Sequence, residues 1–190
     1  NDKKKTFVAD VYSYNEVLDI SKIQTAGQFF VIANLTRALT QLNPQGNIVG
    51  NLVKSWTVKN DYKDYEFQLS DDAKFSDGTK IHPREVINSI KRQIKFNTAN
   101  HFDFSAIEQV EILNDQSFVI RLKKPNDNFL RHTSYPEFGI LHSSDLQKSF
   151  GQGSFQTTSG PYTLQKKGDH FFLLKKNPYF PLADSKSPAE

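Results

Sequence analysis

Three segments of the sequence follow one plan: an alternating apolar and polar run, a short polar turn, and a second alternating run. A period of two places alternate side chains on one face of a strand, and two such runs around a turn form an antiparallel hairpin. The sequence therefore predicts hairpins over residues 55–69, 110–122 and 161–174. The residues expected to face a core are Tyr65, Phe67, Leu69, Phe118, Ile120 and Leu122.

Two other segments follow the period of a helix, in which residues three and four apart share a face. The first, residues 26–42, brings together Val31, Leu35, Ala38 and Leu42, and Asn43-Pro44-Gln45-Gly46 is expected to end it. The second is expected from about Pro83 to Phe96, with an apolar face formed by Val86, Ile90 and Ile94. A further strand is predicted over residues 6–12. Antiparallel hairpins interspersed with helices indicate a mixed α+β fold.

The stretch AKFSDGTKIHPREV, residues 73–86, is expected to connect a strand to the second helix. Asp77-Gly78 is a turn dipeptide, because glycine adopts positive φ without steric cost. Pro83 suits the first helical position and Glu85 suits a capping box, whereas His82 is a poor N-cap residue. On these residues alone the stretch is a structural connector.

Composition excludes several classes of function. The chain has 190 residues, a net charge of +3 with scattered basic residues, and no cysteine. Nucleic-acid binding is therefore not indicated, and disulfides and thiolate metal sites are excluded. No run approaches the roughly 20 apolar residues of a membrane helix. The absence of methionine leads us to expect a processed or excised piece of a longer protein.

No catalytic or metal-binding motif stands out. The histidines at 82, 101, 132, 142 and 170 lack any ligand spacing. Residues 151–155, GQGSF, lack the lysine of a phosphate loop, and Lys74 stands where a calcium loop would need an oxygen ligand. We therefore expect no cofactor, no metal site and no catalytic residues, as in a binding domain.

The order of the segments carries a family resemblance. The blocks that carry it are LTRALTQLNPQGNIVGNLVKSW, YEFQLSDDAKFSDGT, PREVINSIKRQ, IEQVEILNDQSFVIRLKKP, TSGPYTL and LKKNPYF. Together, over about residues 7–181, they resemble the N-terminal third of the family 5 extracellular solute-binding proteins, the dipeptide-, oligopeptide- and nickel-binding receptors of ABC importers. The chain departs from the family pattern at Ser70, Phe75 and His82, where arginine, tryptophan and threonine are usual.

The resemblance implies the fold of a type II periplasmic binding protein, in which two lobes close around a ligand. Residues 1–43 would start lobe I, residues 44–142 would form a small inserted antiparallel β/α subdomain, and residues 143–190 would return toward lobe I. The second lobe would lie outside this chain, which is thus expected to be an N-terminal fragment. The implied protein binds peptides or another small solute, works with a membrane permease, and is periplasmic or extracellular, with a lipid anchor as one option.

The resemblance also implies candidate ligand contacts. In peptide-binding relatives the loop after the first strand carries an acidic-aliphatic pair, which here aligns with Asn15, Glu16 and Val17. A carboxylate at this place would accept a charge-assisted hydrogen bond from a ligand N–H or ammonium group. Phe102 lies where relatives lend an aromatic side chain to the cleft. The alternatives are a plain surface loop for the first three residues and a core role for Phe102.

Two other functions are considered beside a peptide receptor. The same fold could serve as the solute-sensing domain of a transcriptional regulator, and the solute could be nickel or another small molecule. A signal peptide upstream would favour the receptor, whereas a helix-turn-helix upstream would favour the regulator. An enzyme is the least supported class, because no catalytic constellation is present.

Overall fold

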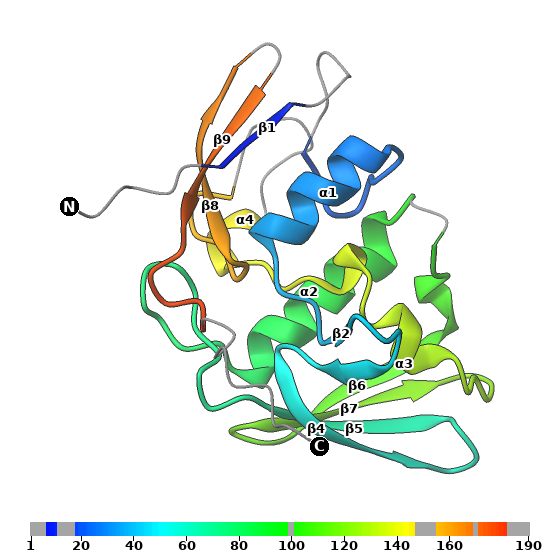
Figure 1. The fold of residues 1–190 in the computed structure, drawn as a ribbon. Helices are drawn as coiled ribbons and strands as arrows, with labels where there is room; N and C mark the ends of the chain where they lie inside the picture. The colour runs from blue at the N-terminus through cyan, green and yellow to red at the C-terminus, as the bar shows by residue number, and fades with distance from the viewer. Residues whose placement is uncertain (1–6, 11–17, 99–100, 147–154, 169–170, 182–190) are drawn as a thin grey trace.

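A computed structural model describes residues 7–10, 18–98, 101–146, 155–168 and 171–181 (Figure 1). Their elements, in chain order, are β1 (Phe7–Asp10), α1 (Ala26–Leu35), β2 (Thr40–Leu42), β3 (Ile48–Gly50), β4 (Val53–Lys59), β5 (Asp64–Leu69), α2 (Pro83–Phe96), η1 (Phe104–Ala106), β6 (Ile107–Asn114), β7 (Ser117–Leu122), α3 (Phe129–His132), η2 (Pro136–Phe138), α4 (Ser143–Leu146), β8 (Tyr162–Lys167) and β9 (Phe171–Lys176). The strands pair antiparallel in the orders β4-β5-β7-β6, β2-β3 and β1-β9-β8. The mixed α+β class is confirmed.

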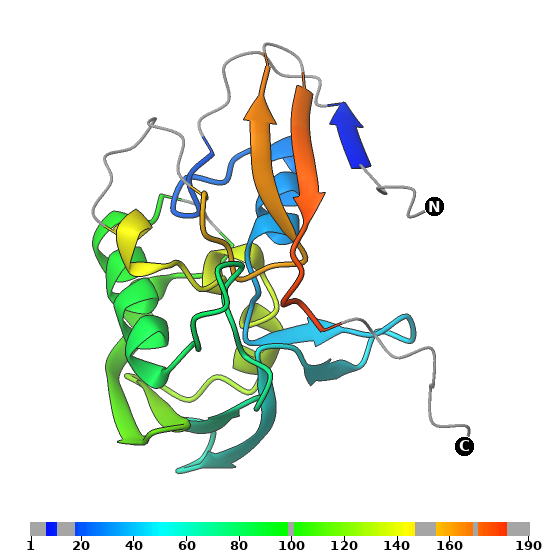
Figure 2. The same ribbon diagram turned by 90° about the vertical axis from the view of Figure 1, so that its left-hand side faces the viewer.

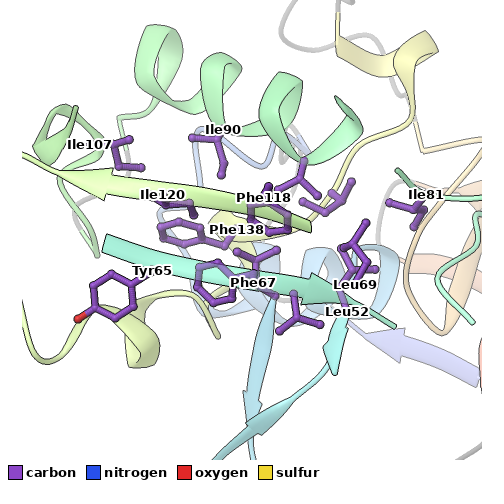
Figure 3. Close-up of a cluster of buried hydrophobic side chains, with 14 of the residues drawn as sticks. Leu52, Tyr65, Phe67, Leu69, Ile81, Ile90, Ile107, Phe118, Ile120 and Phe138 are labelled. Carbon is purple, nitrogen blue, oxygen red and sulfur yellow. The ribbon is translucent and has the colours of Figure 1, made fainter. Parts of the chain in front are cut away.

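The three predicted hairpins are present as β4–β5, β6–β7 and β8–β9. In the largest sheet, Phe67 of β5 pairs with Phe118 of β7, and their rings stack with centroids 5.3 Å apart. All six residues that were expected to face a core are at most 2% exposed. Figure 3 shows several of them between the sheet and helix α2. The predicted strand register is therefore confirmed.

Helix α2 has the predicted bounds, and its first turn is stabilised by Glu85, whose Oε2 accepts the backbone N–H of His82 at 2.9 Å. The expectation that Ile94 faces the core is wrong, since Ile94 is 46% exposed. At 100° per residue, eight residues turn the helix by about 800°, which is about 80° more than two full turns. The residue at i+8, Ile94, therefore lies off the apolar face that contains Val86. The buried face continues through Gln93 instead.

The first helix ends at Leu35 rather than at Leu42, which corrects the prediction for residues 26–42. Thr36 is already extended, with φ −123° and ψ 153°, and the N–H of Arg37 donates to Ser159 Oγ at 2.9 Å. Residues 40–42 form β2, and the run expected to end the helix is the β2–β3 turn. Hydrogen bonds to distant segments thus replace the helical ones, and the sequence period alone does not reveal them.

The buried hydrophobic side chains form two clusters. Figure 2 shows the elements around them, with α1, β8 and β9 in the upper part of the view and the large sheet in the lower part. One lies between the β4–β7 sheet and α2 and is built from residues 39–140. The other lies between α1 and the β8–β9 hairpin and is built from residues 20–35 and 141–174. Where the chain passes between them, the N–H of Ile140 donates to the carbonyl of Arg37 at 3.2 Å. The domain boundaries given from the sequence stay a prediction.

The connector at residues 73–86 forms the expected turn. Asp77 Oδ1 accepts the backbone N–H of Thr79 at 2.9 Å and its hydroxyl at 2.6 Å, and Gly78 has φ +89°. The turn also packs on the distant return segment, because the N–H of Ser76 donates to the Thr158 carbonyl at 2.8 Å. The connector therefore helps to join the two halves of the molecule.

Candidate functional site

The predicted ligand contacts divide into those the structure describes and those it does not. Asn15, Glu16 and Val17 lie outside the described residues, and the described chain resumes at Leu18. Phe102 is described and is 7% exposed within the first hydrophobic cluster. Its ring contacts those of Phe104, Phe129, His132 and Phe138. Phe102 thus has a core role, and a ligand contact at this residue stays a proposal.

Helix α2 holds the segment that follows Val17. The guanidinium of Arg92 binds the carboxylate of Asp19, with Nη1–Oδ1 at 3.1 Å and Nη2–Oδ2 at 2.9 Å, and also contacts Ser21 Oγ. Both charged side chains are at most 8% exposed. A two-point pair of this kind fixes position as well as compensating charge. Residues 18–23 are therefore held in place by the helix that covers the large sheet.

Gln93, the next residue of α2, joins the same segment to a third part of the chain. Its Nε2 donates to the Ile20 carbonyl at 3.3 Å and to the Glu137 carbonyl at 2.6 Å. The N–H of Thr98 adds a bond of 2.8 Å to the Ser21 carbonyl. Because of these bonds, the segment after the predicted ligand loop lies beside the short helix η2, where Glu137 is located.

Glu137 contacts His101, which belongs to a group of ring-bearing residues. We call this group the Glu137 cluster and define it as Phe29, His101, Phe102, His132, Tyr135 and Glu137. His101 Nδ1 contacts Glu137 Oε1, and the His101 ring packs edge-on against Phe29 and Tyr135 with centroids 6.1 and 6.0 Å away. The cluster thus combines a carboxylate, imidazoles and aromatic rings from α1, α3, η2 and the segment after α2.

The electrostatics of this cluster are unusual for a protein interior. The Glu137 side chain is 1% exposed, and its Oε2 has no hydrogen-bond partner among the described residues. The same holds for His132 Nδ1. Burial lowers the pKa of His132, although a hydrogen bond with the backbone of His101 and the charge of Glu137 act in the opposite direction. Glu137 Oε2 and His132 Nδ1 are thus two buried polar atoms without a hydrogen-bond partner among the described residues.

A hollow of about 360 Å³ opens near the cluster, between the end of α2 and residues 102–105. Phe102 and Gln93 line it together with Asn97 and Asp103. It is therefore a second place at which a small polar group could lie against Phe102.

The described residues contain no group of three or more histidine, aspartate or glutamate side chains arranged to hold a metal ion. Among the described helices, none has the length and apolar character needed to cross a membrane.

Sequence reasoning missed the residues that build this site. His101 and His132 were considered only as scattered histidines, Arg92 was considered only as a basic residue toward the C-terminal end of its helix, and Glu137 and Tyr135 were not considered. No local spacing connects them, because the partners come from segments 36 to 73 positions apart. Only the Phe102 assignment pointed to this region, and it came from the family resemblance.

Among known proteins, the chain is similar to periplasmic binding proteins. A probable D,D-dipeptide-binding periplasmic protein of Escherichia coli K12 is 27% identical over 143 residues, which cover 71% of this chain and 28% of the relative. The periplasmic oligopeptide-binding protein OppA of the same organism is 25% identical over 186 residues, covering 86% and 34%. The chain thus spans about a third of the length of these relatives.

Solved structures show the same fold. The substrate-binding domain of an oligopeptide ABC transporter from Bacillus anthracis superimposes with a TM-score of 0.80 at 20% sequence identity, covering 90% of this chain and 38% of that one. Its likeness establishes the fold of the type II periplasmic binding proteins, of which this chain covers part.

Residues 47–189 match the sequence model of a protein family, the bacterial extracellular solute-binding proteins, family 5, middle region. The match covers the large sheet, α2, the Glu137 cluster apart from Phe29, and the β8–β9 hairpin. A match over this share of the chain, in agreement with the fold, shows the family. The chain belongs to the family 5 bacterial extracellular solute-binding proteins.

Proposed function

We propose that this chain is part of a solute receptor of an ABC importer, one that binds dipeptides or oligopeptides in a cleft and delivers them to a membrane permease. The observation that carries the proposal is the family match over residues 47–189, together with relatives whose names are those of dipeptide- and oligopeptide-binding periplasmic proteins. The reported relatives are periplasmic, so we place the protein outside the cytoplasm, with a lipid anchor as an option.

In this proposal the chain binds and does not catalyse. Glu16 would accept an N–H or ammonium group of the peptide, and Asn15 and Val17 would contact its backbone. Phe102 would form part of the wall behind the ligand. The bonds from Arg92 and Gln93 to residues 18–23 support this role, because they fix the backbone directly after Val17. A solute-sensing domain of a regulator is less supported, since the reported relatives are periplasmic binding proteins.

The experiment is isothermal titration calorimetry of the gene product with defined dipeptides, tripeptides and pentapeptides, preceded by mass spectrometry of whatever co-purifies. We expect micromolar or tighter binding of at least one peptide length. Glu16→Gln should weaken that binding about tenfold or more, because a hydrogen bond to a charged group contributes about 1.5–3 kcal/mol. Glu108→Gln, on the exposed part of β6, is the matched control and should bind like wild type.

Binding of nickel salts with no peptide binding would replace peptide by metal as the solute. Binding of neither, together with sequence-specific DNA binding by the gene product, would support the regulator instead.

A further inference from the structure

We propose that the Glu137 cluster is a subsite for a positively charged group of the solute, an alkylammonium or guanidinium group. The inference rests on the proposed function, because it assigns to the receptor a preference among its solutes. Of the cluster's residues only Phe102 was suggested by the family resemblance, and the names of the reported relatives say nothing of Glu137 or His132.

The first step is the state of the buried carboxylate. An ionised carboxylate away from water is costly unless its oxygens are paired. Glu137 is 1% exposed and has one contact, from Oε1 to His101 Nδ1, while Oε2 has none among the described residues. No arginine or lysine of the described chain forms an ion pair with Glu137. The site therefore lacks the donors that a carboxylate needs.

The second step concerns His132, whose Nδ1 is buried and also has no hydrogen-bond partner among the described residues. Its ring lies beside Tyr135 and Phe102, with centroids 5.6 and 5.0 Å away. When the His132 proton is on Nε2, its Nδ1 is an acceptor. This acceptor and Glu137 Oε2 are then matched by a group with several N–H donors and no acceptor. Ammonium and guanidinium groups are the side-chain types with this property.

The third step is the aromatic surroundings. Phe29 and Tyr135 pack against the His101 ring with centroids 6.1 and 6.0 Å away, and Phe102 packs against His132 at 5.0 Å. Aromatic faces attract cations through their quadrupole, and this attraction grows when water is excluded. A buried carboxylate whose contacting histidine packs against Phe29 and Tyr135 is chemistry that suits an organic cation.

The fourth step is access. The side chain of His101 is 45% exposed while that of Glu137 is 1% exposed, so His101 lies between the carboxylate and solvent. A cationic group that displaces the His101 ring would reach Oε1 of Glu137. It could then also donate a hydrogen bond to Oε2 of the same carboxylate. His101 therefore competes with the ligand, and this gives the proposal a directional test.

The test uses the gene product and two matched probe pairs. Calorimetry compares trialanine with N-acetyl-trialanine, and Ala-Lys-Ala with Ala-norleucine-Ala, so that each pair differs by one cationic group. Ring proton NMR of His101 and His132 is recorded with millimolar n-butylammonium and, as the neutral match, n-butanol. We expect a preference of about tenfold or more for the cationic member of at least one pair, and ring shifts with n-butylammonium that n-butanol does not produce.

Glu137→Gln keeps the shape of the side chain and should abolish both the peptide preference and the n-butylammonium shifts. Because this variant could fail to fold, His101→Ala provides an independent measurement. Removing the competing ring should tighten binding of the cationic probes, whereas a residue with a merely structural role would leave or weaken it. Glu108→Gln is the control for the loss of one negative charge elsewhere.

The outcomes separate this inference from the proposed function. Tight peptide binding with equal affinity inside both pairs and no n-butylammonium shift would overturn the subsite and leave the receptor intact. No peptide binding, with n-butylammonium shifts that require Glu137, would overturn the peptide receptor and support the cation subsite. Weaker cation binding by His101→Ala would also contradict the proposal.

Discussion

Arg92 and Asp19, 73 positions apart in the chain, form a two-point ion pair that is buried between helix α2 and the segment after the predicted ligand loop. Arg92 belongs to the helix that covers the large sheet, whereas Asp19 adjoins the second hydrophobic cluster. The pair therefore connects the two cores through charge rather than through apolar packing.

Replacement of Arg92 by methionine should lower the free energy of unfolding by about 3–5 kcal/mol, because it leaves the Asp19 carboxylate buried and uncompensated. Urea denaturation followed by circular dichroism measures this change. Arg84→Met on the same helix is the control, because the Arg84 side chain is 74% exposed and should matter little. The double variant Asp19→Leu, Arg92→Met should be more stable than Arg92→Met alone, and an equal or lower stability would contradict this account.

Phe118→Ala should cost about 3–5 kcal/mol of stability, because Phe118 is fully buried and stacks on Phe67. Ile112→Ala is the matched control, since Ile112 pairs directly with Phe118 across β6 and β7 but is 49% exposed. The measurement is the midpoint of guanidinium denaturation for both variants. A midpoint for Phe118→Ala close to that of the wild type would contradict the register, because a slip of one residue moves every side chain to the other face.

Gly78→Ala should destabilise the protein by about 1–2 kcal/mol, because Gly78 has φ +89°, a conformation that is costly for other residues. A Cβ there would also lie 3.1 Å from Cζ of Tyr179. Gly46→Ala, at φ +80° with nothing within 4 Å, isolates the backbone effect. Any excess cost at Gly78 should disappear in a Tyr179→Ala background.

The same Gly78 variant should bind solute with wild-type affinity wherever it remains folded. A large loss of affinity in folded Gly78→Ala would mean that the turn at residues 76–79 takes part in binding, against its interpretation as a connector.

The stability of the protein should depend on pH through His132. Its pKa is lowered from 6.5 in the folded protein, mainly by burial, so the native state favours the neutral ring. Below about pH 6.5 the unfolded state binds a proton that the native state does not, and stability falls as pH falls toward the lowered pKa. His132→Phe should make the decline between pH 7.5 and 5.5 less steep, as measured by thermal denaturation. His82→Asn, at an exposed position, should leave the slope unchanged.

The parts of the fold that could be predicted are those whose pattern is local. Tyr65, Phe67 and Leu69 alternate strictly, and a strand with one buried face produces that alternation directly. The bounds of α2 follow from Pro83 and from an amphipathic run. The end of α1 could not be predicted, since Thr36 leaves the helix where Ser159 and Ile140 supply hydrogen bonds from a distant part of the chain.

The candidate site could be predicted only in part. Phe102 was identified by family resemblance, and the structure shows that it packs in the core beside His132. Glu137 and His101 are 36 positions apart and become neighbours in the folded chain, where Gln93 of α2 also binds the Glu137 carbonyl. A site assembled by buried polar bonds across segments leaves no periodic trace in the sequence.

The bond between the N–H of Ile140 and the carbonyl of Arg37 has an evolutionary consequence. The chain leaves the region of residues 39–140 beside the place where it came in, so a gene could gain or lose that region as one block with little rearrangement of the remainder. Residues 39–140 would then be exchangeable as one unit among proteins of this family. A transplanted unit would have to bring its own equivalents of Arg92 and Gln93, because these two side chains hold the segment at residues 18–23 that stays behind.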